Sequence, residues 1–190
     1  GAASRLRAFG KAAVYLIIAF ASLLAVSAIL KASTGQTVQS LMQGGSVQSL
    51  IVHAGLFLSL VAVPTTLSLM IWKEPFSFSG WSFANSARLA SIGLATGGGL
   101  MVLFVITLWA LGAWSGSFAT PSIGDMAGAV LIWAAVWLVQ AAHEEGLHRG
   151  YPFVQLSRSL SFWPAASLLS LWFLWGHVGQ EGATAISLVV

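Results

Sequence analysis

The sequence predicts an all-α integral membrane protein, a polytopic bundle of transmembrane helices with five spans and the start of a sixth. Two observations support this fold class. Only 7% of the 190 residues are charged and 57% are hydrophobic, whereas a soluble domain carries roughly 25% charged residues. Apolar runs of about 20 residues, the length that crosses a hydrocarbon core, alternate with the few charged positions. The composition excludes a soluble globular domain, a disordered chain and a nucleic-acid-binding protein.

The first predicted span lies between two lysines. Lys11 and Lys31 enclose nineteen uncharged residues, 12–30, and the basic residues before them resemble the start of a signal peptide. Because the run is long and no small-residue cleavage site precedes Lys31, we expect a retained helix. The polar stretch 32–49, rich in Gly, Gln and Ser, is expected to form a loop.

The second and third predicted spans each carry a feature that membrane helices tolerate. The second covers about 50–72, ends before Lys73 and contains Pro64. Proline predicts a kink, which is tolerated if the freed carbonyl finds a partner. The third covers about 89–113 and contains a glycine triplet at 97–99. Such small residues allow a neighbouring helix to approach closely.

The fourth span is expected to begin near Met126 and to end in a cluster of polar residues. Ser161 and Pro164 predict a capped start for a fifth span over about 162–179. A sixth apolar stretch opens at Ala183 and reaches the end of the sequence. We therefore expect the chain to be a fragment at both ends.

Basic residues near the span ends indicate an orientation. Most of them fall on one predicted side: Arg5, Arg7, Lys11, Lys73, Arg88 and Arg158. Only Lys31 falls on the other side, so the positive-inside rule places the N-terminus in the cytoplasm. We expect an integral protein of a bacterial plasma membrane, with the lipid bilayer as partner. No repeat and no linker divides the chain, so residues 1–190 are interpreted as a single membrane domain.

The end of the fourth span carries acidic and basic side chains, which are costly at membrane depth. Residues four apart share one face of a helix, so Glu144 lies beside His148, and Glu145 lies beside Arg149. The two adjacent carboxylates point about 100° apart. We expect Glu145 and Arg149 to form an internal ion pair that lowers the cost of burying both. Glu144 then remains a free carboxylate that can accept a proton.

The positions of the histidines exclude a metal site of the zinc-protease kind and suggest that His177 pairs with Glu144. His143 and His148 are five residues apart, whereas a zinc-protease helix holds its metal with histidines four apart. His177 is an isolated polar residue in the fifth span. If the fourth and fifth helices form a hairpin that turns near Ser159, Glu144 and His177 lie about 22 Å and 26 Å from the turn. The hairpin would place them at one depth, and Pro152 predicts a kink near Arg149 that makes both distances upper bounds.

These residues resemble the motifs of the CPBP family of membrane proteases, which includes the type II CAAX prenyl proteases and the bacteriocin-processing or immunity (Abi) proteins. The first family motif, Glu-Glu-x-x-x-Arg, is matched by Glu144, Glu145 and Arg149. The second, Phe-x-x-x-His, is matched by Phe173 and His177. Two motifs in adjacent helices are more specific than either motif alone. The motif region lies within the last third of the chain, at about 126–190.

The resemblance implies an intramembrane endopeptidase that hydrolyses a peptide bond in a peptide or protein substrate. Glu144 would activate a water molecule. His177 would help to hold this water, or would bind a divalent metal such as zinc together with Glu144. Glu145 and Arg149 would orient the site. The sequence leaves open whether a metal is used.

The chain departs from the family pattern at three points. His148 stands where an aromatic residue is usual, Pro152 follows the arginine, and no His-x-x-x-Asn or His-x-x-x-Asp motif follows His177. Two alternatives therefore stay open. One is a non-catalytic membrane scaffold or bacteriocin-immunity protein with the same fold, in which the acidic and basic residues form a structural ion-pair network. The other is a proton-coupled transporter that uses Glu144 and His177 as protonatable sites.

Overall fold

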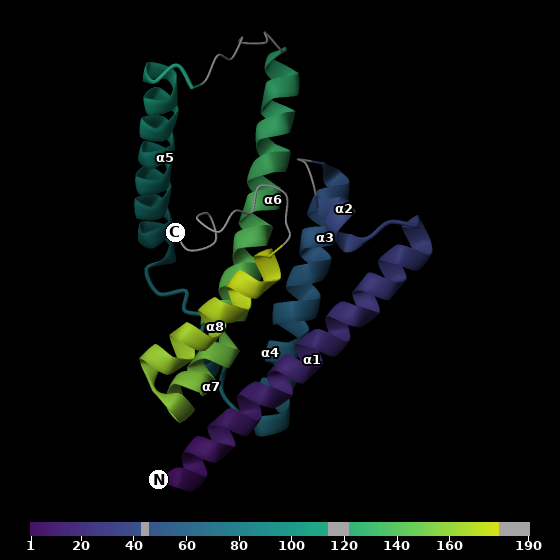
Figure 1. Ribbon diagram of the computed structural model, residues 1–190, viewed down its shortest axis with the longest axis vertical. Helices are drawn as coiled ribbons and strands as arrows, with labels where there is room; N and C mark the ends of the chain where they lie inside the picture. The colour runs from purple at the N-terminus through teal and green to yellow at the C-terminus, as the bar shows by residue number, and fades with distance from the viewer. Residues whose placement is uncertain (43–45, 114–121, 179–190) are drawn as a thin grey trace. The chain divides into compact units, whose positions relative to one another are not determined.

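The computed structural model describes residues 1–42, 46–113 and 122–178, and these residues form helices and connecting turns without any strand (Figure 1). η1 is a π-helical turn and η2 is a 3₁₀ turn. The elements are α1 (Ala2–Thr34), α2 (Val38–Met42), α3 (Val47–Phe57), η1 (Leu58–Ala62), α4 (Val63–Trp72), η2 (Phe76–Ser79), α5 (Ser86–Ala110), α6 (Ile123–Arg149), α7 (Tyr151–Leu160) and α8 (Phe162–His177).

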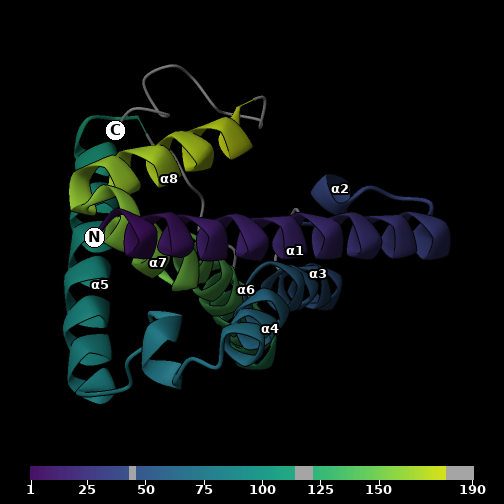
Figure 2. The same ribbon diagram turned by 90° about the horizontal axis from the view of Figure 1, so that it is seen from below.

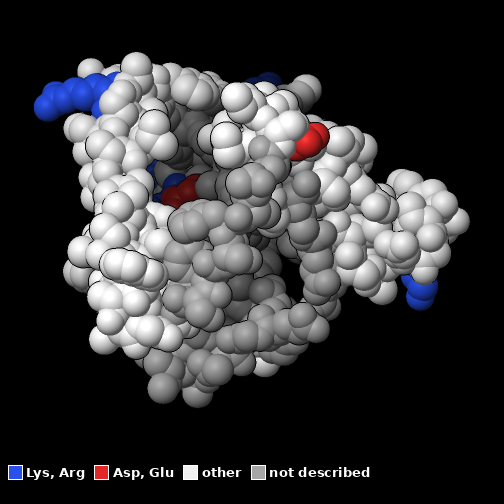
Figure 3. Space-filling model, turned by 90° about the horizontal axis from the view of Figure 1, so that it is seen from above, with Lys and Arg blue, Asp and Glu red and all other residues white. Residues whose placement is uncertain are grey.

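Among the described residues, four helical segments are long and apolar enough to cross a membrane. They are Ala2–Thr34, Val47–Trp72, Ser86–Ala110 and Ile123–Leu160. Many large apolar side chains on these helices are exposed rather than packed inside the protein, and charged atoms occupy a small part of the face in Figure 3. Exposed apolar surface of this extent requires a lipid environment. The all-helical fold class is therefore confirmed, and the four helices indicate an integral membrane protein.

The predicted number of spans is not confirmed. The expected fifth span corresponds to α8, which has 16 residues and is about 24 Å long. A hydrocarbon core is about 30 Å thick, so α8 is short for a spanning helix. The expected start of a sixth span, from Ala183, lies outside the described residues. The expected loop at 32–49 also differs in part, because α1 continues to Thr34 and α2 interrupts the rest.

The chain divides into two compact units. One contains Gly1–Trp81 and Gly128–Val190, and the other contains Ser82–Ala127. The second unit consists mainly of α5, which has no buried residue. The contacts of α1, α3, α4, α7 and α8 and of the end of α6 lie within the first unit.

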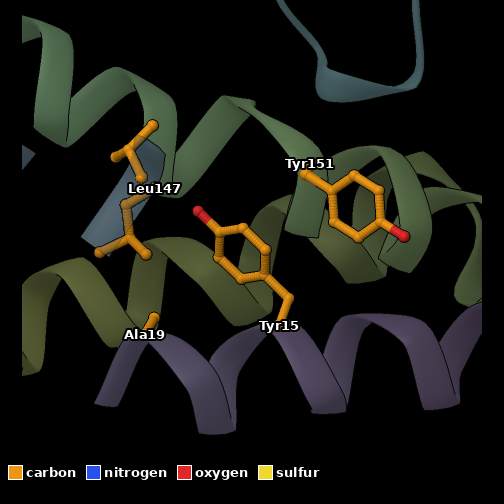
Figure 4. Packing of buried hydrophobic residues seen from close by; sticks show 5 residues of the cluster. Tyr15, Ala19, Leu147 and Tyr151 are labelled. Atoms are coloured by element: carbon orange, nitrogen blue, oxygen red, sulfur yellow. The ribbon is translucent and has the colours of Figure 1, made fainter. Parts of the chain in front are cut away.

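In the first unit, α1 runs beside α3 and α4 and passes α7 (Figures 1 and 2). A core cluster joins α1, the second candidate span, α6 and α7 through Tyr15, Ala19, Val61, Leu147 and Tyr151. In Figure 4, the rings of Tyr15 and Tyr151 lie beside each other, and their hydroxyl groups point in opposite directions. The ring centroids are 5.6 Å apart. These two tyrosines therefore reach polar partners on opposite sides of the core.

Pro64 is accommodated by a local change of helix type. A proline has no backbone N–H, so the carbonyl four residues earlier, that of Leu60, loses its usual α-helical partner. Residues Leu58–Ala62 form the π-helical turn η1, and the Tyr15 hydroxyl donates a hydrogen bond to the Leu60 carbonyl oxygen at 2.7 Å. The freed carbonyl therefore has a partner, which is the condition under which a membrane helix tolerates a proline. The same bond ties α1 to the middle of the second span.

The fourth predicted helix is broken immediately after its arginine. α6 ends at Arg149, and α7 begins at Tyr151 with Pro152 in its first turn, as proline in this position predicts. Gly80 packs directly against the break, because a Cβ atom at Gly80 would lie 2.7 Å from the Cα of Gly150. A side chain at Gly80 would therefore collide with the backbone of Gly150, and a side chain at Gly150 would collide with the carbonyl of Gly146.

The break corrects the expected hairpin. The chain turns at Ser161, close to the predicted position, but the helix that packs against α8 is α7. Ala12 of α1, Leu156 of α7, and Ala165 and Leu169 of α8 form the cluster that holds this pair. Because Gly150 separates Glu144 from α7, counting helical rise from the turn does not give the relative depth of Glu144 and His177.

Candidate functional site

The first motif occupies the last two turns of α6. The Glu144 side chain is half-buried, and its Oε1 accepts a hydrogen bond from Gln140 Nε2 at 3.1 Å. His148 Nδ1 lies 2.7 Å from the main-chain oxygen of Glu144. The shared helix face predicted for Glu144 and His148 is thus present, but the histidine bonds the backbone instead of the carboxylate. Within the described part of the chain, the second carboxylate oxygen of Glu144 has no hydrogen bond, so it can accept one from a further donor such as water.

Glu145 and Arg149 form the predicted ion pair, with Arg149 Nε 3.2 Å from Glu145 Oε2. The expectation that the protein buries this pair is wrong. The side chains of Arg149 and Glu145 are 78% and 53% exposed, because their face of α6 points away from the core cluster. The pair can therefore hold the local geometry of α6 but contributes little to packing.

The second motif meets the first through two rings. The ring of His148 on α6 contacts that of Phe173 on α8 edge to face, with centroids 4.9 Å apart. Phe173 in turn lies 4.1 Å from the ring of His177, whose Nδ1 is bonded to the Phe173 carbonyl oxygen. α8 has 16 residues and α7 has 10, so α8 extends past the start of α7 and reaches the end of α6.

This contact explains one departure from the family pattern. The resemblance leads us to expect an aromatic residue before the arginine, and His148 supplies a ring that packs against Phe173 as an aromatic side chain does. Its Nε2 is buried and has no hydrogen-bond partner among the described residues. The sequence indicates that His148 lies beside Glu144 on one helix face, but we expected no role for its ring in the site. Its i+4 spacing from Glu144 is the signal that could have indicated one.

The predicted pair of Glu144 and His177 is not directly joined. Across residues 1–42, 46–113 and 122–178, no hydrogen bond connects the two side chains. No group of three His, Asp or Glu side chains in these ranges converges on one point. The expected binding of a divalent metal such as zinc by His177 and Glu144 stays a prediction.

A second pair of rings links α6 to α3. The imidazoles of His53 and His143 have centroids 5.9 Å apart, and both side chains are buried. His53 Nδ1 is bonded to the Ser49 carbonyl oxygen at 2.8 Å. His143 Nδ1 has no partner within the described part of the chain. His143 directly precedes Glu144 on α6, so its contact with His53 joins this part of the motif helix to α3.

The strongest polar contacts were not predicted from the sequence. Glu74, directly after α4, is bonded by three side chains from other elements. Lys11 Nζ of α1 lies 2.5 Å from its Oε1. The Tyr151 hydroxyl and Gln155 Nε2 of α7 donate to its Oε2 at 2.8 Å and 3.3 Å. We call these four residues the Glu74 cluster.

The Glu74 cluster is nearly enclosed by protein. The side chains of Lys11 and Glu74 are 11% and 9% exposed, and Gln155 is fully buried. Burial by itself raises the pKa of the Glu74 carboxyl, but the hydrogen bonds from Lys11, Tyr151 and Gln155 outweigh this effect, so the pKa lies below its usual value. Glu74 is therefore held as a carboxylate that joins α1, the end of α4 and α7.

Comparison of the chain with protein-family models, with curated proteins and with solved structures finds no match. The motif residues and their arrangement are therefore the observations that bear on function.

Proposed function

We propose that the protein is an intramembrane endopeptidase of the CPBP type, in which Glu144 activates the water that cleaves the peptide bond. The observation that carries the proposal is the contact between His148 and Phe173, since it brings one residue from each motif region together. The two motifs are separated in the sequence by a helix and a turn. Their meeting in space is what a shared site requires.

The proposed chemistry needs a base, an acid and a group that holds the water. The Glu144 carboxylate removes a proton from water while the water oxygen attacks the carbonyl carbon of the substrate. The resulting tetrahedral intermediate collapses as the C–N bond breaks, and Glu144 returns the proton to the leaving amine. His177, next to Phe173, holds the attacking water or the oxyanion.

Two further contacts support these roles. Gln140 donates to one oxygen of Glu144, which fixes the rotamer of the carboxylate and leaves the other oxygen for water. Glu145 and Arg149 form their ion pair on the adjacent face of α6. The charges of Glu145 and Arg149 neutralise each other. Among the described residues, the Glu144 carboxylate at the end of α6 therefore has no charged partner.

The test uses the full chain in liposomes with a panel of membrane-anchored peptides in H₂¹⁸O. Hydrolysis inserts one ¹⁸O atom into each new C-terminal carboxylate, which mass spectrometry detects. We expect Glu144→Gln to lower the rate by roughly 10²-fold or more, the size of a general-base effect. Asp125→Asn is the matched control, since Asp125 is an exposed acidic residue of the same helix. Cleavage by Glu144→Gln at the rate of Asp125→Asn would contradict the proposal.

A non-catalytic membrane scaffold is the second candidate function. It is favoured by one observation, the lack of a hydrogen bond between Glu144 and His177 among the described residues. In that case, neither the native chain nor any variant incorporates ¹⁸O into the panel. The same experiment therefore separates the two candidates.

A further inference from the structure

A pocket of about 390 Å³ opens between the start of α1 and α7. It lies wholly within the first compact unit and contains none of the residues in the proposed mechanism. Its lining is polar and basic, and consists of Ser4, Arg7, Ala8, Lys11, Gln155 and Arg158. The proposed peptidase function gives this pocket no role.

The pocket carries uncompensated positive charge. Lys11 is neutralised by Glu74, but no acidic side chain within the described ranges pairs with Arg7 or Arg158. The guanidinium of Arg158 lies over the ring of Phe78 at 4.4 Å from its centroid. Stacking uses the face of a guanidinium and leaves the N–H groups at its edge free to bind an anion. Two cationic groups are thus available to one ligand.

A buried oxygen adds a second, independent requirement. Gln155 is fully buried, and its Nε2 donates to Glu74, so its Oε1 points elsewhere and has no partner in the described part of the chain. Turning the amide around would set its oxygen against the Glu74 carboxylate, which is unfavourable. The atom without a partner is therefore the amide oxygen, a hydrogen-bond acceptor. A ligand that bonds to it must supply a donor such as a hydroxyl group.

The position along α1 places the pocket at the level of lipid headgroups. Lys11 directly precedes the uncharged run 12–30, which matches the hydrocarbon core. Arg7 is four residues earlier, about 6 Å further out along the helix axis. The headgroup layer adds about 5–8 Å on each side of the core. Arg7 and Lys11 therefore bracket the depth at which phospholipid phosphates lie.

We propose that this pocket binds the headgroup of an anionic phospholipid whose phosphate carries a hydroxyl-bearing substituent, such as a glycerol headgroup. Arg7 and Arg158 bind the phosphate, and Gln155 Oε1 accepts a hydrogen bond from the hydroxyl group. Lys11 remains paired with Glu74, so the ligand contacts the edge of the Glu74 cluster. A lipid bound there would hold α1 against α7 at the membrane surface.

The test measures lipid affinity of the full chain in detergent by native mass spectrometry, with phosphatidylglycerol as the probe. We expect Arg7→Gln and Arg158→Gln each to weaken binding about five-fold, as expected for one basic residue near an anionic headgroup. Arg5→Gln is the matched control, because Arg5 is on the same helix turn but does not line the pocket. Equal losses for Arg5→Gln and Arg7→Gln would overturn the proposal, since they would indicate surface charge alone.

Two comparisons test the hydroxyl group and the source of the phosphate. Phosphatidylmethanol keeps the charge but lacks the hydroxyl, so we expect it to bind more weakly than phosphatidylglycerol, and Gln155→Met to remove this preference. An unchanged preference in Gln155→Met would overturn the role of Gln155. Soluble glycerol 3-phosphate is the second probe. If it binds as tightly as the lipid, the site belongs to a soluble phosphate ester and the lipid assignment is wrong.

Discussion

Two ion pairs in the described part of this protein each join a glutamate to a basic side chain, and they differ in what surrounds them. Glu145 and Arg149 lie one turn apart on α6 and are mostly exposed. Lys11 and Glu74 lie 63 positions apart in the chain and are nearly buried. The first pair is exposed on one face of α6, and an ion pair exposed to water costs little to break. The second has no alternative partner, because each of its charges is enclosed by protein.

The difference separates a region that holds the fold from a region with available polar atoms. In the Glu74 cluster, the hydrogen bonds of Glu74 join α1 and α7 to the end of α4. The motif region of α6 retains polar atoms without a hydrogen-bond partner among the described residues, such as the buried Nε2 of His148. We expect substitutions in the first region to change stability and substitutions in the second to change activity.

The largest expected effect on stability is that of Glu74→Ala. It leaves Lys11 charged and enclosed without a partner, which costs about 3 kcal/mol or more of the free energy of unfolding. The effect is measured as the loss of folded protein in a thermal melt monitored by size-exclusion chromatography. Glu145→Ala is the control and should change stability by less than about 0.5 kcal/mol. Equal melting temperatures for the two variants would remove the distinction between the two pairs.

Tyr15→Phe should have the next largest effect. It removes the hydroxyl bonded to the Leu60 carbonyl and should cost about 1–2 kcal/mol, since the carbonyl is left unsatisfied. The double variant with Pro64→Ala sharpens the test, because alanine restores the N–H that proline lacks. We expect Tyr15→Phe to cost less in the Pro64→Ala background than in the native one. A double-mutant cycle with no coupling would show that the tyrosine does not compensate for the proline.

Gly146→Ala tests the packed side of α6. A Cβ atom at Gly146 would lie 2.5 Å from Val61 Cγ1 and 2.9 Å from Trp81, so Val61 must shift. We expect a loss of about 1 kcal/mol, as for a mildly overpacked core. Gly128→Ala on the same helix has open space around its Cβ position, and there alanine should stabilise by up to about 1 kcal/mol through helix propensity. Opposite signs in chemical or thermal unfolding would confirm the difference.

The smallest expected effect is on pH dependence. The pKa of Glu74 is lower in the folded protein than its ordinary value, so its contribution to stability is complete above about pH 4.3, the ordinary carboxyl value. The contribution is lost as the pH falls through the lower, folded pKa. Melting temperatures measured across this acid range should fall less steeply in Glu74→Gln than in the native chain. Glu145→Gln should retain the native slope.

The sequence predicts the parts of the fold that depend on local pattern. Apolar runs between charged residues located the four candidate spans, and Pro64 and Pro152 located the irregular turn and the helix break. The ion pair of Glu145 and Arg149 was predicted because both residues lie on one helix face. These features depend on residues within one apolar run or within one or two turns of the same helix.

The remaining features depend on contacts between distant segments. The partners of Glu74 on α7 are 77 and 81 residues away, and no periodicity links them. In the sequence, Glu74 looks like an ordinary solvated charge after a span. The contact of α8 with the end of α6 also could not be predicted, because it depends on how far the chain bends at Gly150. That bend brings the ring of Phe173 on α8 into contact with the ring of His148 on α6.

The most direct test measures activity and stability together in Glu144→Gln and Glu74→Ala, using the ¹⁸O assay and a thermal melt on the same liposomes. We expect Glu144→Gln to lose cleavage and keep the native melting temperature. Glu74→Ala should melt earlier but cleave at the native rate per folded molecule. If Glu144→Gln cleaves at the native rate, or loses activity only because it unfolds like Glu74→Ala, the assignment of catalysis to Glu144 is contradicted.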